Sequence, residues 1–380
     1  MIHNVEVMHL EDQVLCLCTR PRFTAVYQQQ VIELSQKQLI NWQIVFDAAE
    51  LHHVSPLVYH SLAQLNPEQI GLTDSVRKQF KTAQIHNVML KKGTHSTLKT
   101  VLHKFTEASI DVMLVKGTVL NLLVYDKPWY MISGDVDMVI KEASEESFKA
   151  SPHAQIAHDI DKINTYRNKF QQHIEFDFWS HHDMTMNGIL KIDGAYLWER
   201  AKKIEAFDNP VYVLPPEELL LSAAINACRK RFFRLKALCD ISSIIETQPD
   251  LDWSYICRIA KLWQAHTILY TALIMTQRTL GCDFPSHVLS DLKLSTVRRR
   301  IINRSIDRLL THSLTSSAQW SSHHIFGRNY SQALLLTYTT YTPKLLLKKL
   351  VEIVAAWWDP PSPILPPVEP KQNLPSPQRS

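Results

Sequence analysis

Two aspartates two positions apart, Asp135 and Asp137, are the sharpest chemical feature of this sequence. They stand in residues 134–140 (GDVDMVI), whose alternation of acidic and apolar side chains predicts a β-strand. Alternate side chains of a strand lie on one face, so the two carboxylates share a face while Val136 and Met138 face the core. Neighbouring carboxylates repel unless a cation lies between them, so the pair predicts a site for a hard divalent ion, above all Mg²⁺.

Two further acids, Glu175 and Asp177, have the same spacing in a second predicted strand, residues 173–180 (HIEFDFWS). If the two strands are neighbours, a third carboxylate lies beside the first two. Three carboxylates from adjacent strands are what a two-metal phosphoryl-transfer site requires. Glu175, or Asp177 beside it, could also accept the proton of an attacking hydroxyl.

A short apolar strand, residues 111–115 (DVMLV), is expected to lead into a helix through Lys116, Gly117 and Thr118. The backbone N–H groups and the hydroxyl at such a helix start suit a triphosphate, although the segment is not a Walker loop. Lys116 either neutralises a phosphate oxygen or extends into water, and the family resemblance described below favours the first interpretation.

Other residues are predicted to contact the nucleotide. Ser133 and Gly134 directly precede the aspartate pair, where a glycine lets a nucleotide approach the backbone closely. Residues 229–236 hold five bases and no acid, which form either a solvated helix face or a face turned to the carboxylates. From this run Lys230 and Arg234 are assigned to the nucleotide, whereas Lys236 could pair with Asp240 four residues later.

The rest of the sequence predicts an α+β fold, in which a small mixed sheet is embedded between helical regions. Only 8 of 380 residues are glycine, which favours helices. Residues 23–105 have helical periodicity, with Pro56 and Pro67 expected at helix starts, and Pro215 and Pro216 announce a return to helices. The predicted divisions are an N-terminal helical region, a core, a C-terminal helical region and a proline-rich disordered tail, at 1–108, 109–214, 215–358 and 359–380.

The composition limits the expected partners and cellular location of the protein. A net charge of +4 is too small for a nucleic-acid coat, so a protein or small-molecule partner is favoured over RNA or DNA. The sequence has no uncharged apolar segment long enough to predict a transmembrane helix. It also has neither a secretory signal pattern nor the cysteine spacing of a disulfide framework, and these observations together predict a cytoplasmic protein. The proline-rich tail could bind a protein partner.

Residues 112–140 (VMLVKGTVLNLLVYDKPWYMISGDVDMVI) resemble the signature of the uncharacterised nucleotidyltransferase branch of the DNA-polymerase-β-type superfamily. The resemblance extends through LHHVSPLVYHSL upstream and through LPPEELLLSAAINACRKRFFRLKALCDISSII and DWSYICRIAKLW downstream, and covers roughly residues 40 to 285. It implies a Mg²⁺-dependent nucleotidyltransferase that moves a nucleoside monophosphate, with AMP from ATP as the first expectation, to an acceptor and releases pyrophosphate.

By the same resemblance Asp135, Asp137 and Glu175 would hold two Mg²⁺ ions, with Mn²⁺ as a substitute, and Gly117 and Thr118 would cradle the triphosphate. The chain also departs from the branch. It has Met131 where arginine is usual, Asp177 where histidine follows the third acid, and Asn226 and Lys230 at two histidine positions.

Two alternatives stay open. The departures allow a catalytically degenerate, partner-binding or regulatory protein of the same fold. An Asp-x-Asp pair also holds Mn²⁺ on a sugar nucleotide in glycosyltransferases, but those enzymes place several strands before the motif and this chain places one.

Overall fold

The structure is a computed structural model of the 380-residue chain. It describes residues 8–20, 22–132, 135–141, 186, 189–232, 234–310, 314 and 339, and the backbone alone of residues 175–178. The sequence also predicts strands over residues 153–160 (HAQIAHDI) and 163–170 (INTYRNKF), and these segments and the proline-rich tail lie outside the described ranges. The described residues belong to one compact unit, Met1–Thr340.

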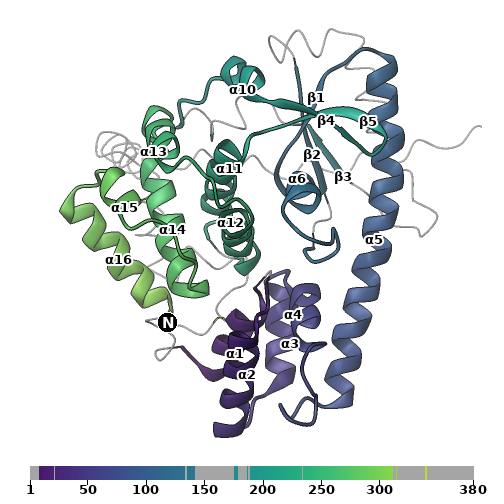
Figure 1. Ribbon diagram of the computed structural model, residues 1–380, viewed down its shortest axis with the longest axis vertical. Coiled ribbons are helices and arrows are strands. Elements are labelled where there is room, and N and C mark those ends of the chain that lie inside the picture. The colour runs from purple at the N-terminus through teal and green to yellow at the C-terminus, as the bar shows by residue number, and fades with distance from the viewer. Residues whose placement is uncertain are drawn as a thin grey trace, which may run out of the picture. The chain divides into compact units, whose positions relative to one another are not determined.

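A five-stranded mixed sheet forms the centre of this unit, in the order β3-β2-β1-β5-β4 (Figure 1). β1 pairs antiparallel with β2 and parallel with β5, β2 pairs parallel with β3, and β4 pairs antiparallel with β5. The strand bounds are Val112–Leu114 for β1, Asp135–Ile140 for β2, Glu175–Phe178 for β3, Lys202–Ala206 for β4 and Asn209–Val213 for β5. With helices on either side in sequence, the predicted α+β class is confirmed.

The hairpin of β4 and β5 was not predicted. Its turn residues, Phe207 and Asp208, both have positive φ (54° and 56°), as a two-residue hairpin turn requires. The side chain of Asn209 secures the turn by donating to the backbone oxygens of Phe207 (2.7 Å) and Lys99 (3.2 Å). The sequence does not predict β5 because it contains Pro210, and proline is usually excluded from the hydrogen-bonded ladder of a sheet.

The helices before the sheet end in a 34-residue helix, α5, which extends beside the sheet and contacts β5 (Figure 1). Pro56 lies in the first turn of α4, as predicted. The expectation for Pro67 is wrong: it begins a turn before α5, where its carbonyl accepts from the N–H of Leu72. The helix bounds are Leu10–Cys18 for α1, Ala25–Lys37 for α2, Trp42–Leu51 for α3, Ser55–Leu62 for α4 and Asp74–Glu107 for α5.

The helices after the sheet begin at the predicted signal, with Pro215 as N-cap of α11. The second acid of its first turn, Glu218, is fully buried and accepts from Arg200 (3.0 Å) and from the hydroxyl of Tyr255. The remaining bounds are Lys116–Leu123 for α6, Gly194–Arg200 for α10, Pro216–Arg229 for α11, Leu235–Thr247 for α12, Trp253–Leu262 for α13, His266–Leu280 for α14, His287–Asp291 for α15 and Thr296–Leu310 for α16.

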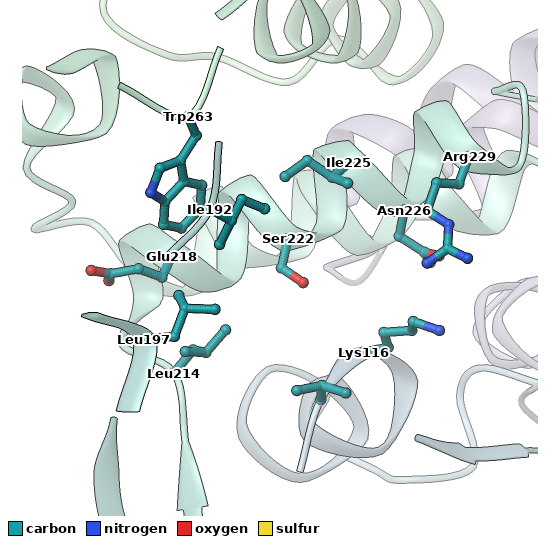
Figure 2. A pocket seen from close by; sticks show the side chains of 11 residues that line it. Lys116, Ile192, Leu197, Leu214, Glu218, Ser222, Ile225, Asn226, Arg229 and Trp263 are labelled. Carbon is teal, nitrogen blue, oxygen red and sulfur yellow. The ribbon is translucent and has the colours of Figure 1, made fainter. Parts of the chain in front are cut away.

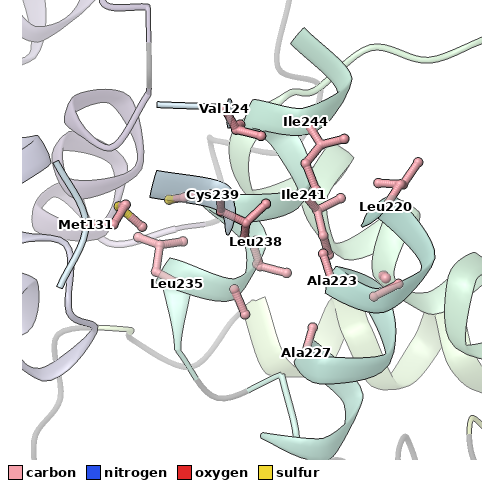
Figure 3. Close-up of a cluster of buried hydrophobic side chains, with 14 of the residues drawn as sticks. Val124, Met131, Leu220, Ala223, Ala227, Leu235, Leu238, Cys239, Ile241 and Ile244 are labelled. Carbon is pink, nitrogen blue, oxygen red and sulfur yellow. The ribbon is translucent and has the colours of Figure 1, made fainter. Parts of the chain in front are cut away.

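The core is continuous from the sheet into these helices. α11, α12 and α14 pack on one another, and α11 also contacts α6. Met131, just before β2, belongs to the same buried cluster as Leu235 and Cys239 of α12 (Figure 3). The connection into β2 is thus fixed by apolar packing on the C-terminal helices. In the part of the chain that the structure describes, no helix has the length and hydropathy needed to cross a bilayer.

Candidate functional site

The two aspartates of β2 differ in exposure. Asp135 begins the strand and is partly exposed, whereas the side chain of Asp137 is only 4% exposed. Val136 and Met138 are fully buried in the core, as the alternation predicts. Because Val136 and Met138 face the core, Asp135 and Asp137 lie on the other face of the strand.

The second acidic strand is the neighbour of the first. β3 runs parallel to β2 in a register that pairs Asp135 with Glu175 and Asp137 with Asp177. Paired positions on adjacent strands lie about 5 Å apart across the sheet. The backbone therefore brings all four predicted acidic positions to one edge of the sheet, and the predicted adjacency of the two strands is confirmed.

Lys116 lies directly against this edge. Its Nζ is 2.6 Å from Oδ1 of Asp137, and its side chain is 15% exposed. Burial lowers the pKa of Lys116 below its usual range, although the carboxylate of Asp137 opposes this by favouring the ammonium form. Lys116 therefore pairs with Asp137 and does not extend into water, and its assignment to a phosphate oxygen stays a prediction.

Gly117 and Thr118 follow Lys116 in the first turn of α6. The first N–H groups of a helix have no acceptor within the helix and lie at its positive end, so this turn suits an anionic oxygen. Val115 precedes it as N-cap, and its N–H donates to the backbone oxygen of Asp137 (3.1 Å). That bond fixes the first turn of α6 beside Asp137.

Three basic side chains from outside the sheet lie near Asp135. Arg234 is the N-cap of α12, His53 follows α3, and Lys91 comes from the middle of α5. Burial is the largest cause that lowers the pKa of each of these groups, and the negative charge of Asp135 partly offsets it in all three. Of these only Arg234 was predicted, since nothing in the local sequence pattern of α3 or α5 indicates a contact with β2.

Lys91 is the least expected member of this set. It is only 3% exposed, and burial with the nearby charge of Lys236 lowers its pKa to about 7. Lys236 pairs with Asp240 (2.7 Å), as its spacing indicated, and the hydroxyl of Tyr125 donates to the other oxygen of Asp240 (2.7 Å). Buried ammonium groups are costly unless they serve a partner or a ligand, so this cluster is a functional candidate.

A pocket adjoins Lys116 on the side of α11, with about 550 Å³ of empty space, part of which is open solvent (Figure 2). Lys116, Asn226 and Arg229 gather at one end of it, and Trp263 with aliphatic side chains forms the other. Ser222 lies between the two ends (Figure 2). The mixture of a large apolar wall with a few polar groups is typical of small-molecule sites. The remaining lining residues are Val115, Ile192, Leu197, Leu214, Glu218 and Ile225.

A model of the uncharacterised nucleotidyltransferase family matches residues 38–281 of the chain. The chain belongs to this family. The matched range runs from α3 to α14 and so includes the sheet, the acidic strands and the pocket. No curated protein and no solved structure matches the chain.

The departures from the usual family pattern take definite places in the structure. Met131 is fully buried, so an apolar contact stands where the family usually has arginine. Asn226 lines the pocket, whereas Lys230 is exposed at the C-cap of α11. Ser133 and Gly134, assigned to the nucleotide, lie outside the described residues.

The donors on the acidic strands fit the metal that the family implies. Asp135 and Asp137 offer hard carboxylate oxygens, which suit Mg²⁺ and Mn²⁺. Among side chains that the structure describes, no group of three acids, histidines or cysteines is close enough to form a complete metal site. A third carboxylate from β3, where Glu175 is in register with Asp135, would complete the set.

Proposed function

We propose that this protein is a Mg²⁺-dependent nucleotidyltransferase that transfers a nucleoside monophosphate, AMP from ATP in the first instance, to a protein or small-molecule acceptor and releases pyrophosphate. The observation that carries the proposal is the pairing of two acidic strands beside a helix start: Asp135 and Asp137 on β2 are in register with Glu175 and Asp177 on β3. Membership of a nucleotidyltransferase family supports it.

Each group of residues has its own task in this reaction. Asp135, Asp137 and Glu175 would hold the divalent ions, which supply charge neutralisation at the α-phosphate and lower the pKa of the attacking hydroxyl. The first-turn N–H groups of Gly117 and Thr118 bind phosphate oxygens. Asp177 or Glu175 accepts the proton of the attacking hydroxyl.

The basic groups around Asp135 offset the negative charge of the triphosphate. Lys91 of α5 and Arg234, the N-cap of α12, come from outside the sheet, so the helical regions contribute to the proposed site. Fixed positive charges in a partly buried site act strongly on phosphate oxygens, because water screens them little. The apolar end of the pocket suits the part of a substrate that carries no phosphate.

The test is direct. The protein is mixed with each of four labelled nucleoside triphosphates and Mg²⁺ or Mn²⁺, with its own lysate fractionated into proteins and small molecules as acceptor source. We expect metal-dependent pyrophosphate release and a labelled product, strongest with ATP. The half-buried Asp111, which pairs with Lys141 away from the site, provides the control variant Asp111→Asn with unchanged release. Failure to bind any triphosphate with either metal would sink the proposal.

One observation favours a second candidate, a non-catalytic regulatory protein of the same fold. Met131 stands at the position where the family usually has arginine, and its side chain is fully buried in the core. Under this alternative an Asp137→Asn variant keeps the biological activity of the protein, and bound triphosphate stays intact with every acceptor. Loss of activity in that variant supports the enzyme.

A further inference from the structure

The ammonium of Lys116 lies at Asp137, where the proposed function also places a divalent ion. Its Nζ is 2.6 Å from Oδ1 of Asp137, and the two side chains are 15% and 4% exposed. A carboxylate this deeply buried requires a counter-charge, because water is largely absent to stabilise it. In the structure the ammonium of Lys116 supplies that charge to one of the oxygens that the proposed function assigns to a divalent ion.

The backbone holds this arrangement at a cost. Lys116 has a φ of 53°, the left-handed region that favours glycine and costs other residues roughly 1 kcal/mol or more. The residue before it is fixed, since the N–H of Val115 donates to the backbone oxygen of Asp137. The strained turn therefore places the side chain of Lys116 directly on β2, and such strain is typical of functional positions.

The same lysine begins the helix that offers N–H groups to phosphate. It is the first residue of α6, immediately before Gly117 and Thr118. Figure 2 shows its ammonium at the end of the pocket that also holds Asn226 and Arg229. A lysine side chain is long and flexible, so one set of rotations carries Nζ from Asp137 toward an anion bound at this helix start.

We propose that Lys116 is a stand-in cation: it neutralises Asp137 while no divalent ion is bound, and transfers to a phosphate oxygen of the nucleotide when the ion takes Asp137. This inference rests on the proposed function and adds a coupling to it. Two cations at one carboxylate repel each other, so free metal binds weakly. A nucleotide that accepts Lys116 removes this repulsion, and by reciprocity bound metal strengthens the binding of nucleotide.

A permanent ion pair makes a different prediction for phosphate. If Lys116 stays with Asp137 throughout, its removal relieves the repulsion of the metal but leaves the affinity for phosphate unchanged. If Lys116 transfers to the nucleotide, its removal strengthens Mn²⁺ binding and also weakens phosphate binding. The affinity for Mn²⁺ therefore tests the competition at Asp137, and the affinity for phosphate in the presence of Mn²⁺ distinguishes the two cases. Neither measurement needs turnover.

The experiment compares the wild type with Lys116→Met, which keeps an unbranched side chain one atom shorter and removes its charge. Mn²⁺ is titrated while the free ion is followed by electron paramagnetic resonance. We expect Lys116→Met to bind Mn²⁺ about tenfold more tightly, in the usual range of coupling between two ligands. Lys141→Met, in which the exposed lysine just after β2 is changed, is the matched control and binds Mn²⁺ like the wild type. Asp137→Asn loses the site.

A second measurement follows phosphate. In the presence of Mn²⁺, inorganic tripolyphosphate and ATP are titrated by calorimetry, and we expect both to bind Lys116→Met about tenfold more weakly than the wild type. Because Lys116→Met could be less stable, thermal unfolding is followed with and without Mn²⁺. The ion is expected to raise the Tm of Lys116→Met more than that of the wild type.

The outcomes separate this inference from the proposed function. Mn²⁺ affinity that is unchanged or weaker in Lys116→Met overturns the inference, even where the wild type releases pyrophosphate from ATP. Failure of the proposed function has another signature: the wild type binds neither ATP nor tripolyphosphate at any Mn²⁺ concentration. In that case the transfer of Lys116 to phosphate is overturned as well.

Discussion

Nη1 of Arg234 lies 3.0 Å from Nδ1 of His53, and this hydrogen bond joins the end of α3 to the start of α12. A guanidinium can only donate, so Nδ1 of His53 accepts and carries no proton. The neighbouring His52 strengthens the joint, because its Nδ1 accepts from the N–H of Leu235 (3.3 Å). The loop after α3 therefore holds Arg234 on the side of Asp135, within reach of the proposed phosphate site.

This contact makes the folded state sensitive to acid. Burial, followed by the charge of Arg234, lowers the pKa of His53 from 6.5 to about 4. The unfolded chain takes up the proton near pH 6.5 and the folded chain only near pH 4, so the free energy of unfolding falls as the pH drops between these values and is unaffected above them. We expect His53→Asn to make this fall shallower in urea unfolding measured from pH 4.5 to 7.5.

The control for this prediction is His287→Asn, at the exposed first residue of α15, which is expected to keep the wild-type pH dependence. His60, His95 and His266 also have lowered pKa values through burial, so His53→Asn reduces the slope and does not abolish it. An identical slope in the wild type and His53→Asn contradicts the prediction.

Asp137 is expected to be indispensable for turnover. Its loss removes a ligand of the proposed divalent ions, which contribute several kcal/mol to the stability of the transition state, so Asp137→Asn should lower kcat/KM at least about 100-fold. The variant also leaves the ammonium of Lys116 without its partner, which should lower the Tm. The double variant Asp137→Asn with Lys116→Met should regain the Tm and stay inactive. Recovery of activity in the double variant contradicts a metal-binding role.

The sequence was sufficient for the part of the site that depends on local pattern. The period-two alternation around Asp135 placed both aspartates on one face, and the same pattern around Glu175 placed a second acidic strand, which the structure pairs with the first. The helix start at Lys116 follows from the predicted strand over residues 111–115, which ends immediately before it. Each of these inferences needs only a few consecutive residues.

The rest could not be inferred, since it depends on contacts between distant segments. Lys91 is one of many lysines on a long amphipathic helix, and only the packing of α5 on the sheet brings it to Asp135. His53 is placed by the loop after α3. The usual preferences of proline gave wrong expectations at two positions. Pro210 lies inside the unpredicted strand β5, and Pro67 begins a turn instead of a helix.

Lys91→Met should raise the stability of the fold while weakening the binding of the triphosphate. At 3% exposure the ammonium is costly to bury, and its lowered pKa of about 7 means that the unfolded chain binds the proton more readily than the folded chain below its ordinary pKa of 10.5. A buried methionine has no such cost, so the Tm at pH 7 should rise. If Lys91 serves phosphate, KM for the triphosphate should rise about tenfold, in the range of a hydrogen bond to a charged group.

Lys104→Met, in the last turn of the same helix and exposed, is the control for Lys91→Met and should change neither quantity. A purely structural Lys91 gives the reverse pattern, a lower Tm with unchanged KM. Thermal unfolding at pH 7 and steady-state kinetics on the same preparations distinguish the two patterns.

Ser222→Trp tests whether the pocket beside Lys116 takes part in the reaction. Ser222 is half-buried between the polar end at Asn226 and the apolar end at Trp263, so an indole there fills the space without entering the core. Misplacement of a substrate by even 1 Å is costly, and we expect kcat/KM to fall at least about tenfold with little change in Tm. A rise in KM for the triphosphate alone places the nucleoside in the pocket, and a rise for the acceptor alone places the acceptor there. Ser290→Trp on the exposed face of α15 should leave both KM values unchanged, and wild-type kinetics in Ser222→Trp would exclude the pocket from substrate binding.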